Sequence, residues 1–366
     1  MSKRIKHIGL LFIASIAMML PLHANNADNE TNAEEKVDVA EIIMGHLGDA
    51  YEWHITTIGE THITIPLPII VYSETSGLNI FSSSHLMHGT GEYNGFSIAK
   101  EGSYAGKVVE KNAAGENVRP WDISITKNTL SLMMSSILLL VIILSVARWY
   151  KKNCTAENPK APKGFIGFME LFIMNINDEV IKPCIGKNYR KFAPYLLTAF
   201  FFIFINNILG LIPIFPGGAN VTGNIAITLV LALFTFFMVN AFATKEYWKE
   251  IINPEVPTWL KLPLPIMPVI EIVGVLTKPF ALMIRLFANI LAGHSIILGL
   301  ISIIFVTGSI GAAICAPMTF VSVVMAIFMN FVEVLVAYIQ AYVFTMLSAV
   351  FIGLAQVEPH HAKEKH

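Results

Sequence analysis

Long apolar runs dominate the chain after residue 128 and predict membrane-spanning helices. The first run, residues 130–147, has 18 residues, which is enough for one helix to cross about 30 Å of hydrocarbon. Four more runs follow it, at residues 193–212, 224–243, 266–306 and 318–356. The pattern predicts an all-α polytopic membrane protein with about five transmembrane helices.

The last two runs are longer than one membrane crossing requires. At about 1.5 Å per residue each would extend roughly 60 Å, twice the hydrocarbon thickness, so both must tilt, kink or follow the interface. Residues 307–317 separate them and contain no Lys or Arg, but do contain Gly308, Gly311 and Pro317, which break helices. We therefore expect a long, tilted C-terminal helical hairpin with a periplasmic turn.

The N-terminus has the pattern of a secretory signal peptide. Lys3, Arg4 and Lys6 precede a short apolar run at residues 8–20, and residues 22–24 resemble a cleavage site. We predict a signal peptide over residues 1–24. An uncleaved anchor helix is the alternative, although the apolar run is short for a membrane span.

Residues 25–128 are more polar than the rest of the chain. The segment starts with acidic residues and continues with β-branched and aromatic stretches, such as residues 53–57 and 62–65, which glycine-containing turns interrupt. We expect a small β-rich periplasmic segment. Its five histidines match no metal-ligand spacing, which favours surface or strand histidines over a metal site: His46, His54, His62, His85 and His88.

Basic residues near the ends of the runs predict the orientation. A basic cluster at residues 148–163 follows the first span, which places that end in the cytoplasm by the positive-inside rule. The loop at residues 213–223 has no Lys or Arg and is expected outside. The mixed segment at residues 165–187 is expected to lie along the inner membrane surface as an amphipathic helix. The N-terminus is then periplasmic, and residues 358–366 form a cytoplasmic tail.

Composition agrees with a membrane protein and excludes other classes. Of 366 residues, 54% are hydrophobic and 14% are charged, against about 25% charged residues in a typical soluble domain. The net charge of −1 does not suit a nucleic-acid partner. None of the three cysteines lies between residues 25 and 128, so the exported segment has no disulfide. Residues 102–107 approach a nucleotide-binding loop but have the wrong spacing.

Ionisable and amide side chains interrupt the last two apolar runs. Such residues are costly inside a membrane and mark functional sites by default. Arg285 lies in an apolar context, too far from either end of its run for the side chain to reach the interface easily. A structural ion pair between packed helices is the alternative. The polar positions are Glu271, Lys278, Arg285, Asn289, His294, Asn330, Glu333 and Gln340.

A hairpin that turns near residue 313 would bring some of these positions level with one another. Residues equally far from the turn lie at the same height, so we expect Arg285 level with Gln340, and His294 level with Glu333. Arg285 and His294 are nine residues apart, about half a revolution on a straight helix. The hairpin would present a cation on one surface and a His–carboxylate pair on another, which suits a separate proton-access path.

The same residues resemble the signature of the ATP synthase subunit a family. Residues 278–294 carry the resemblance, together with Glu333 and Gln340 seven residues later, and residues 204–213 and 220–224 support it. The resemblance implies a proton-translocating stator subunit that forms proton half-channels against a rotor c-ring and couples proton flow to rotation and ATP synthesis. Residues 129–357 would form the transmembrane proton-channel domain.

The resemblance also implies partners and site residues. The partners are the rotor c-ring, peripheral-stalk b subunits, the rest of the F-type ATP synthase and membrane lipid, with no cofactor; the chain itself would not catalyse ATP chemistry. Arg285 is implied as the essential rotor-facing arginine. The residues implied to line or tune the proton path are Glu271, Asn289, His294, Glu333 and Gln340.

Two features concern how this chain relates to the family. Some members carry Glu and His where this chain has His294 and Glu333, so the pair persists with its members exchanged. The long N-terminal segment departs from the shorter family pattern.

Two other classes of function share some of these features. An ion-coupled secondary transporter would also bury Arg and Glu, but such folds usually show internal repeats, and none is found in this sequence. A membrane anchor for the periplasmic segment would not need polar residues at matched depths in two helices.

Overall fold

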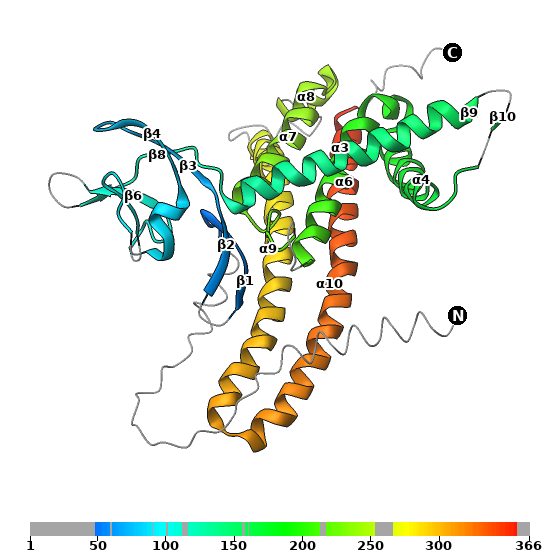
Figure 1. The fold of residues 1–366 in the computed structure, drawn as a ribbon. Helices are drawn as coiled ribbons and strands as arrows, with labels where there is room; N and C mark the ends of the chain where they lie inside the picture. The colour runs from blue at the N-terminus through cyan, green and yellow to red at the C-terminus, as the bar shows by residue number, and fades with distance from the viewer. Residues whose placement is uncertain are drawn as a thin grey trace, which may run out of the picture. The chain divides into compact units, whose positions relative to one another are not determined.

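The computed structural model describes residues 48–356, apart from residues 59–60, 90, 100–101, 112–115, 156–157, 160, 213–216 and 253–265. The predicted signal peptide and cytoplasmic tail therefore lie outside the described residues. Within them, a β-rich N-terminal segment precedes a long helical region (Figure 1), as the sequence predicts.

The N-terminal segment consists of short antiparallel sheets. One sheet has the order β4-β3-β8, another the order β5-β6-β7, and β1 pairs with β2. A 3₁₀ helix, Ser83–Gly89, follows β4. The strands are β1 (Glu52–Ile58), β2 (Thr61–Pro66), β3 (Pro68–Ser73), β4 (Gly77–Ser82), β5 (Phe96–Ile98), β6 (Val108–Lys111), β7 (Asn117–Val118) and β8 (Trp121–Asp122).

Alternation along β3 explains how this segment buries a core. Ile69 and Val71 are fully buried, while the residues between them face the other way, as the two-residue period of a strand requires. Phe96 and Val108 join them in one apolar cluster. Of the five histidines, His85 is the one whose side chain the structure describes, and its ring stacks on Tyr93 with centroids 4.4 Å apart.

The helical region carries most of the described chain. Four helical stretches are long and apolar enough to cross a membrane, and the shorter α7 is also apolar, which agrees with the prediction of about five spans. A small hairpin, β9 (Cys154–Thr155) and β10 (Asn158–Pro159), follows the first helix. The helices are α3 (Lys127–Asn153), α4 (Phe165–Asn175), α5 (Lys182–Ile185), α6 (Tyr189–Leu211), α7 (Ile225–Ala241), α8 (Lys245–Ile252), α9 (Ile266–Ile310) and α10 (Ala312–Ala355).

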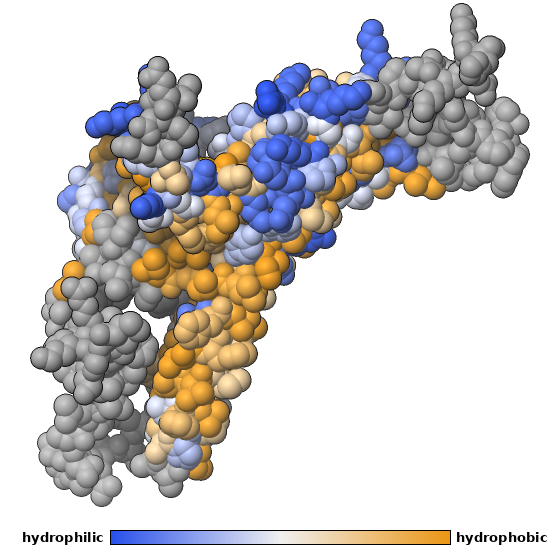
Figure 2. Space-filling view, turned by 90° about the vertical axis from the view of Figure 1, so that its right-hand side faces the viewer, coloured by the Kyte–Doolittle hydropathy of each residue, from blue (hydrophilic) through white to orange (hydrophobic). Residues whose placement is uncertain are grey.

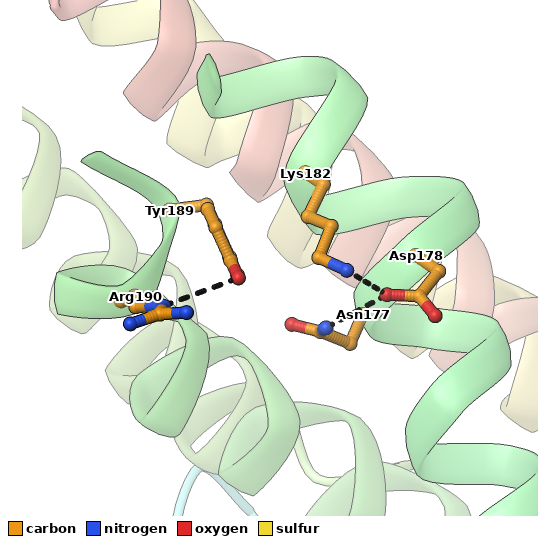
Figure 3. Close-up of polar contacts among 5 residues, drawn as sticks. All are labelled: Asn177, Asp178, Lys182, Tyr189 and Arg190. Carbon is orange, nitrogen blue, oxygen red and sulfur yellow. Dashed lines mark hydrogen bonds and ion pairs between the residues drawn. The ribbon is translucent and has the colours of Figure 1, made fainter. Parts of the chain in front are cut away.

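Helical turns continue from α4 to α6, so no extended loop separates the two helices. A π-helical turn at Ile176–Ile181 and a 3₁₀ turn at Gly186–Asn188 connect the helices. Figure 3 shows the exposed polar side chains here: the carboxylate of Asp178 forms an ion pair with Lys182. Arg190 donates from Nε to the hydroxyl of Tyr189 at 3.3 Å.

The two longest helices, α9 and α10, form the predicted hairpin and run side by side (Figure 1). The predicted loop at residues 307–317 is wrong, because α9 continues to Ile310 and α10 begins at Ala312. The reversal is confined to Gly311, whose φ of 142° is accessible to glycine. Thr307 stays helical by donating its hydroxyl to the carbonyl of Ile303 at 2.8 Å.

Much of the helical surface is apolar. On one face, hydrophobic residues form a broad band while hydrophilic residues gather toward one end (Figure 2). Exposed residues of α10 include Phe320 and Phe331, each 72% exposed. Exposed apolar side chains of this kind are expected where helices contact lipid.

Candidate functional site

The hairpin brings together one buried ionisable pair. Glu333 on α10 is 4% exposed and His294 on α9 is 17% exposed, and Nδ1 of the imidazole contacts Oε1 of the carboxylate. The second carboxylate oxygen, Oε2, is also buried and has no hydrogen-bond partner among the described residues. The predicted level pairing of His294 with Glu333 is therefore what the structure has.

Gly293 makes room for this pair. A Cβ atom at Gly293 would lie 3.0 Å from Oε1 and 3.2 Å from Cδ of Glu333. Since this is tighter than an ordinary van der Waals contact, even alanine would press on the carboxylate. The absence of a side chain at this position lets the carboxylate approach the backbone of α9 closely.

The other edge of the imidazole faces the end of α6. Nε2 of His294 lies 3.6 Å from the place that a Cβ of Gly210 would occupy, and the carbonyl of Ala219 is also 3.6 Å from that place. His294 therefore lies between α10 on one side and the α6–α7 connection on the other.

The last turns of α6 and the connection that follows hold a group of buried polar residues, which we call the asparagine cluster: Asn206, Asn207, Asn220 and Thr222. Asn207 donates to the carbonyl of Ala337 at 3.2 Å and accepts from the hydroxyl of Thr222 at 2.7 Å. Oδ1 of Asn206 and Nδ2 of Asn220 are buried without a partner among the described residues. Unpaired buried amide atoms are unusual and are typical of places that water or ions visit.

Arg285 has the opposite environment. It is exposed, and the part of the chain that the structure describes offers it no ion pair or hydrogen bond. The buried stripe of α9 runs through Leu282, Leu286 and Ile290, and Arg285 lies about 100° around the helix from Leu286. The guanidinium is therefore on the outer surface of the hairpin.

Gln340 has a different partner from the one that the hairpin geometry suggested. Its Oε1 accepts from Nδ2 of Asn289 at 2.8 Å, one helical turn beyond Arg285. Asn289 lies about 40° from Arg285 around α9, on the side of the buried stripe. The rotation of α9 about its own axis therefore decides which residue reaches Gln340. The distance of a residue from the hairpin turn does not specify this rotation.

A second polar group lies near the start of α9. Tyr247 on α8 has a raised pKa, because the ring is partly buried and because the negative charge of Glu271 disfavours the phenolate. Glu271 itself is exposed, and Nζ of Lys278 lies 5.7 Å from the ring centroid of Phe351. Thr235, Asn240, Tyr247 and Lys278 line one small pocket between these helices, which we call the Lys278 pocket.

Buried hydroxyls extend from this pocket toward the centre of the bundle. The hydroxyl of Tyr195 is 2.8 Å from that of Thr235, which is 3.4 Å from the hydroxyl of Ser348. These side chains come from α6, α7 and α10. Sequence reasoning assigned no role to them or to the asparagine cluster, although the two adjacent asparagines in an apolar run were a visible signal.

These features define a class of protein before any comparison. A polytopic membrane protein with an unpaired arginine on its apolar surface, a buried His–Glu pair and two further polar groups has the features of an ion-translocating subunit. Within the residues that the structure describes, no group of three or more His, Cys, Asp or Glu side chains is arranged to hold a metal ion.

Comparison with known proteins gives the family. The family described as ATP synthase A chain matches residues 131–353. The chain therefore belongs to the ATP synthase A chain family, the proton-translocating stator subunits of the membrane sector. A second family, described as a domain of unknown function, matches residues 42–124.

Relatives from several bacteria are similar over about two thirds of this chain. ATP synthase subunit a of Chlorobium phaeobacteroides is 42% identical over 248 residues, which are 66% of this chain and 68% of that protein. ATP synthase subunit a 2 of Chlorobaculum tepidum is 46% identical over 65% of each chain. ATP synthase subunit a of Anaeromyxobacter dehalogenans is 38% identical over 66% of this chain and 60% of its own length.

Proposed function

We propose that Arg285 is the fixed cation that faces a carboxyl group on the rotor ring, and that the two polar groups beside it form two proton half-channels. The observation that carries this proposal is the exposure of Arg285 on an apolar helix surface without a partner in the described chain. A charge in such a place is costly unless an anion from another subunit neutralises it.

The rotor partner follows from the chemistry of a carboxyl group that passes through lipid. Protonated and neutral, a rotor carboxyl can face hydrocarbon; ionised, it needs a cation. Arg285 keeps its charge at any physiological pH and offers that cation. It also repels protons, so it blocks direct leakage between the two half-channels.

The His294–Glu333 pair and the asparagine cluster are the proposed half-channel on the hairpin-turn side. His294 is nine residues from Arg285, which corresponds to about 14 Å along a helix. An imidazole can both accept and donate a proton, so this pair can pass protons between water and the rotor carboxyl. The unpaired atoms of Asn206 and Asn220 provide sites for water molecules along the path.

Glu271, Tyr247 and the Lys278 pocket are the proposed half-channel toward the other membrane surface. Glu271 is 14 residues from Arg285, about 21 Å along a helix, in the direction away from the hairpin turn. Asn289 and Gln340, joined by their hydrogen bond, lie between the two half-channels and tune the surroundings of Arg285.

We place the N-terminal segment in the periplasm and the C-terminus in the cytoplasm of a bacterial inner membrane. The basic residues after the first span and the signal-peptide pattern support this orientation. Cysteines introduced at the exposed Ser84 and Ser103 should react with an impermeant reagent once the outer membrane is opened. Labelling that requires disruption of the inner membrane would contradict the orientation.

The experiment that tests the function uses the intact complex. The chain would be tagged, purified with its partners and reconstituted into vesicles, and ATP-driven proton uptake would be followed with a pH-sensitive dye. We expect the rotor c-ring and peripheral-stalk b subunits to copurify, and uptake to collapse with an uncoupler. A tagged chain that purifies alone, or ATP hydrolysis without proton uptake in intact complexes, would refute the proposal.

A further inference from the structure

The outer face of the β4-β3-β8 sheet is apolar, and most of its side chains are exposed in the part of the chain that the structure describes. Cross-strand pairing sets Tyr72 beside both Leu78 and Trp121, and Ile70 beside Ile80. We call this surface the apolar sheet face; its residues are Ile70, Tyr72, Leu78, Ile80, Trp121 and Ile123. None of the six side chains carries a charge.

Five of these side chains are exposed and Ile70 is half-buried, while the opposite face of the same sheet is a packed core. Trp121 is 74% exposed, Ile123 69% and Ile80 65%, whereas Ile69 and Val71 are fully buried. An antiparallel sheet with one face in water normally alternates apolar and polar residues. This sheet is apolar on both faces, which indicates that the outer face contacts something other than water.

The apolar sheet face lies close in sequence to the first membrane span, which indicates what it contacts. The backbone N–H of Ile123 donates to the carbonyl of Ile70 at 2.9 Å, and that of Ile125 to Pro68 at 3.2 Å. Lys127, the first residue of α3, donates its N–H to the carbonyl of Ala50 at 2.9 Å. The sheet is therefore tied by hydrogen bonds to the segment that enters the first membrane span.

This tether limits how far the face can lie from the membrane. Lys127 is four residues after Ile123 in the chain, and four residue steps span at most about 14 Å. The polar interface of a bilayer is itself roughly 5–8 Å thick on each side. The exposed apolar side chains of α3 continue the same kind of surface beyond the tether, beginning with Met133 and Ile137.

The residue types also suit a bilayer interface. Trp and Tyr are enriched at the level of the lipid headgroups, where an apolar ring with one polar group fits well. The exposed Arg119 lies two residues before Trp121, where a basic side chain can meet lipid phosphate. The carboxylate of Asp122 points the other way, because it accepts a hydrogen bond from Tyr51 on the core side.

We infer that the apolar sheet face is a lipid-binding surface that docks the N-terminal segment on the bilayer interface beside the first span. None of the six residues of the apolar sheet face belongs to either proposed half-channel, so the docking can be tested separately from the proton path. It gives the segment a fixed height above the membrane, set by side chains that insert among the headgroups.

Spin-label depth measurements on the assembled complex in lipid nanodiscs would test this inference. Labels would be attached at Leu78→Cys and Ile80→Cys, with Ser84→Cys and Ser103→Cys as exposed controls in the same segment. The nanodiscs would contain phosphatidylethanolamine and phosphatidylglycerol, and the background chain would carry serine in place of its native cysteines, Cys154, Cys184 and Cys315.

The two collision reagents separate the possible occupants. We expect labels at Leu78 and Ile80 to collide severalfold more with oxygen relative to a polar nickel chelate than the two serine-site labels do, because oxygen concentrates in lipid. High nickel-chelate collision at all four sites would mean that the face is in water. Low collision with both reagents would mean that a protein partner covers it, and dipolar broadening would mean a second copy. Each of these three results would overturn the inference.

Discussion

Arg285 and the His294–Glu333 pair lie on the same helical hairpin but in opposite environments. Arg285 is exposed, and within the described residues it has no ion pair. Glu333 is 4% exposed and contacts the imidazole of His294. Both places carry ionisable groups in otherwise apolar helices, so the difference between them is not a difference in local composition.

The contrast indicates which part of the complex neutralises each charged side chain. The carboxylate of Glu333 has its counterpart within the chain, since it contacts the imidazole of His294. Arg285 is incomplete until another subunit supplies an anion, which is the property that a contact with a moving rotor requires.

Substitution of Arg285 should have the largest effect. Arg285→Ala removes the cation that an ionised rotor carboxyl needs, and an uncompensated charge of this kind costs about 3–5 kcal/mol, or more than about a hundredfold in rate. Arg285→Lys should also be severely impaired, because a compact ammonium lacks the planar fork of the guanidinium. ATP synthesis in energised vesicles measures both, with complex assembly as the control. Normal proton-coupled ATP synthesis with Arg285→Ala would contradict the role of Arg285 as the cation that faces the rotor carboxyl.

Exchange of the buried pair should have the next largest effect. His294→Glu and Glu333→His place like groups together, and each should reduce proton pumping about tenfold or more. The double exchange restores a His–carboxylate pair in reverse order and should recover part of the activity. Pumping by the four variants forms a double-mutant cycle. A double variant no better than the product of the two single effects would show that the residues act independently.

A smaller change to the same pair should have a smaller effect. Gly293→Ala brings a methyl group to 3.0 Å from the carboxylate of Glu333, which overpacks the site by about 1–3 kcal/mol. We expect pumping to fall while the complex still assembles. Gly299→Ala is the matched control, because no atom lies within 4 Å of its added Cβ, and alanine favours the helix by about 1 kcal/mol. Equal effects of the two substitutions would contradict the close packing.

A change in the N-terminal segment should leave both charged places undisturbed. Burial and the neighbouring Asp122 raise the pKa of Tyr51. Because this pKa is raised in the folded protein, the protonated hydroxyl of Tyr51 contributes its full stabilisation below the unfolded-state pKa of about 10. That stabilisation is lost as the pH rises from there through the pKa of the folded state. Tyr51→Phe should destabilise the segment by about 1–3 kcal/mol at neutral pH. The rate at which a protease cleaves residues 48–124 measures this loss of stability. A loss of proton pumping in complexes that remain assembled would show that the segment takes part in the proton path.

The sequence predicts the hairpin and the buried pair well, for a physical reason. Two apolar runs too long for single crossings, joined by breakers, favour antiparallel packing, and positions equally far from the turn then meet. His294 and Glu333 do so. The turn itself is tighter than predicted, because Gly308 and Pro317 are tolerated within the helices and Gly311 alone reverses the chain.

What the sequence does not specify is how each helix is rotated and what lies behind it. Gln340 was expected level with Arg285, but it bonds Asn289, which the rotation of α9 turns toward α10. The asparagine cluster also depends on tertiary packing, since Asn207 and Thr222 meet only when the α6–α7 connection folds back on α10. One-dimensional patterns contain no information about such a fold-back.

Disulfide cross-linking would show whether the surface around Arg285 faces the rotor. Cysteines would be placed at the exposed Ala281 and Ala288, one turn on either side of Arg285, and at the buried Leu282 and Leu286 as controls. Each would be combined with a cysteine beside the rotor carboxyl and oxidised in membranes. We expect cross-links to the ring from Ala281→Cys and Ala288→Cys and none from the buried positions. Cross-links from Leu282→Cys or Leu286→Cys alone, or none from the exposed pair, would contradict it.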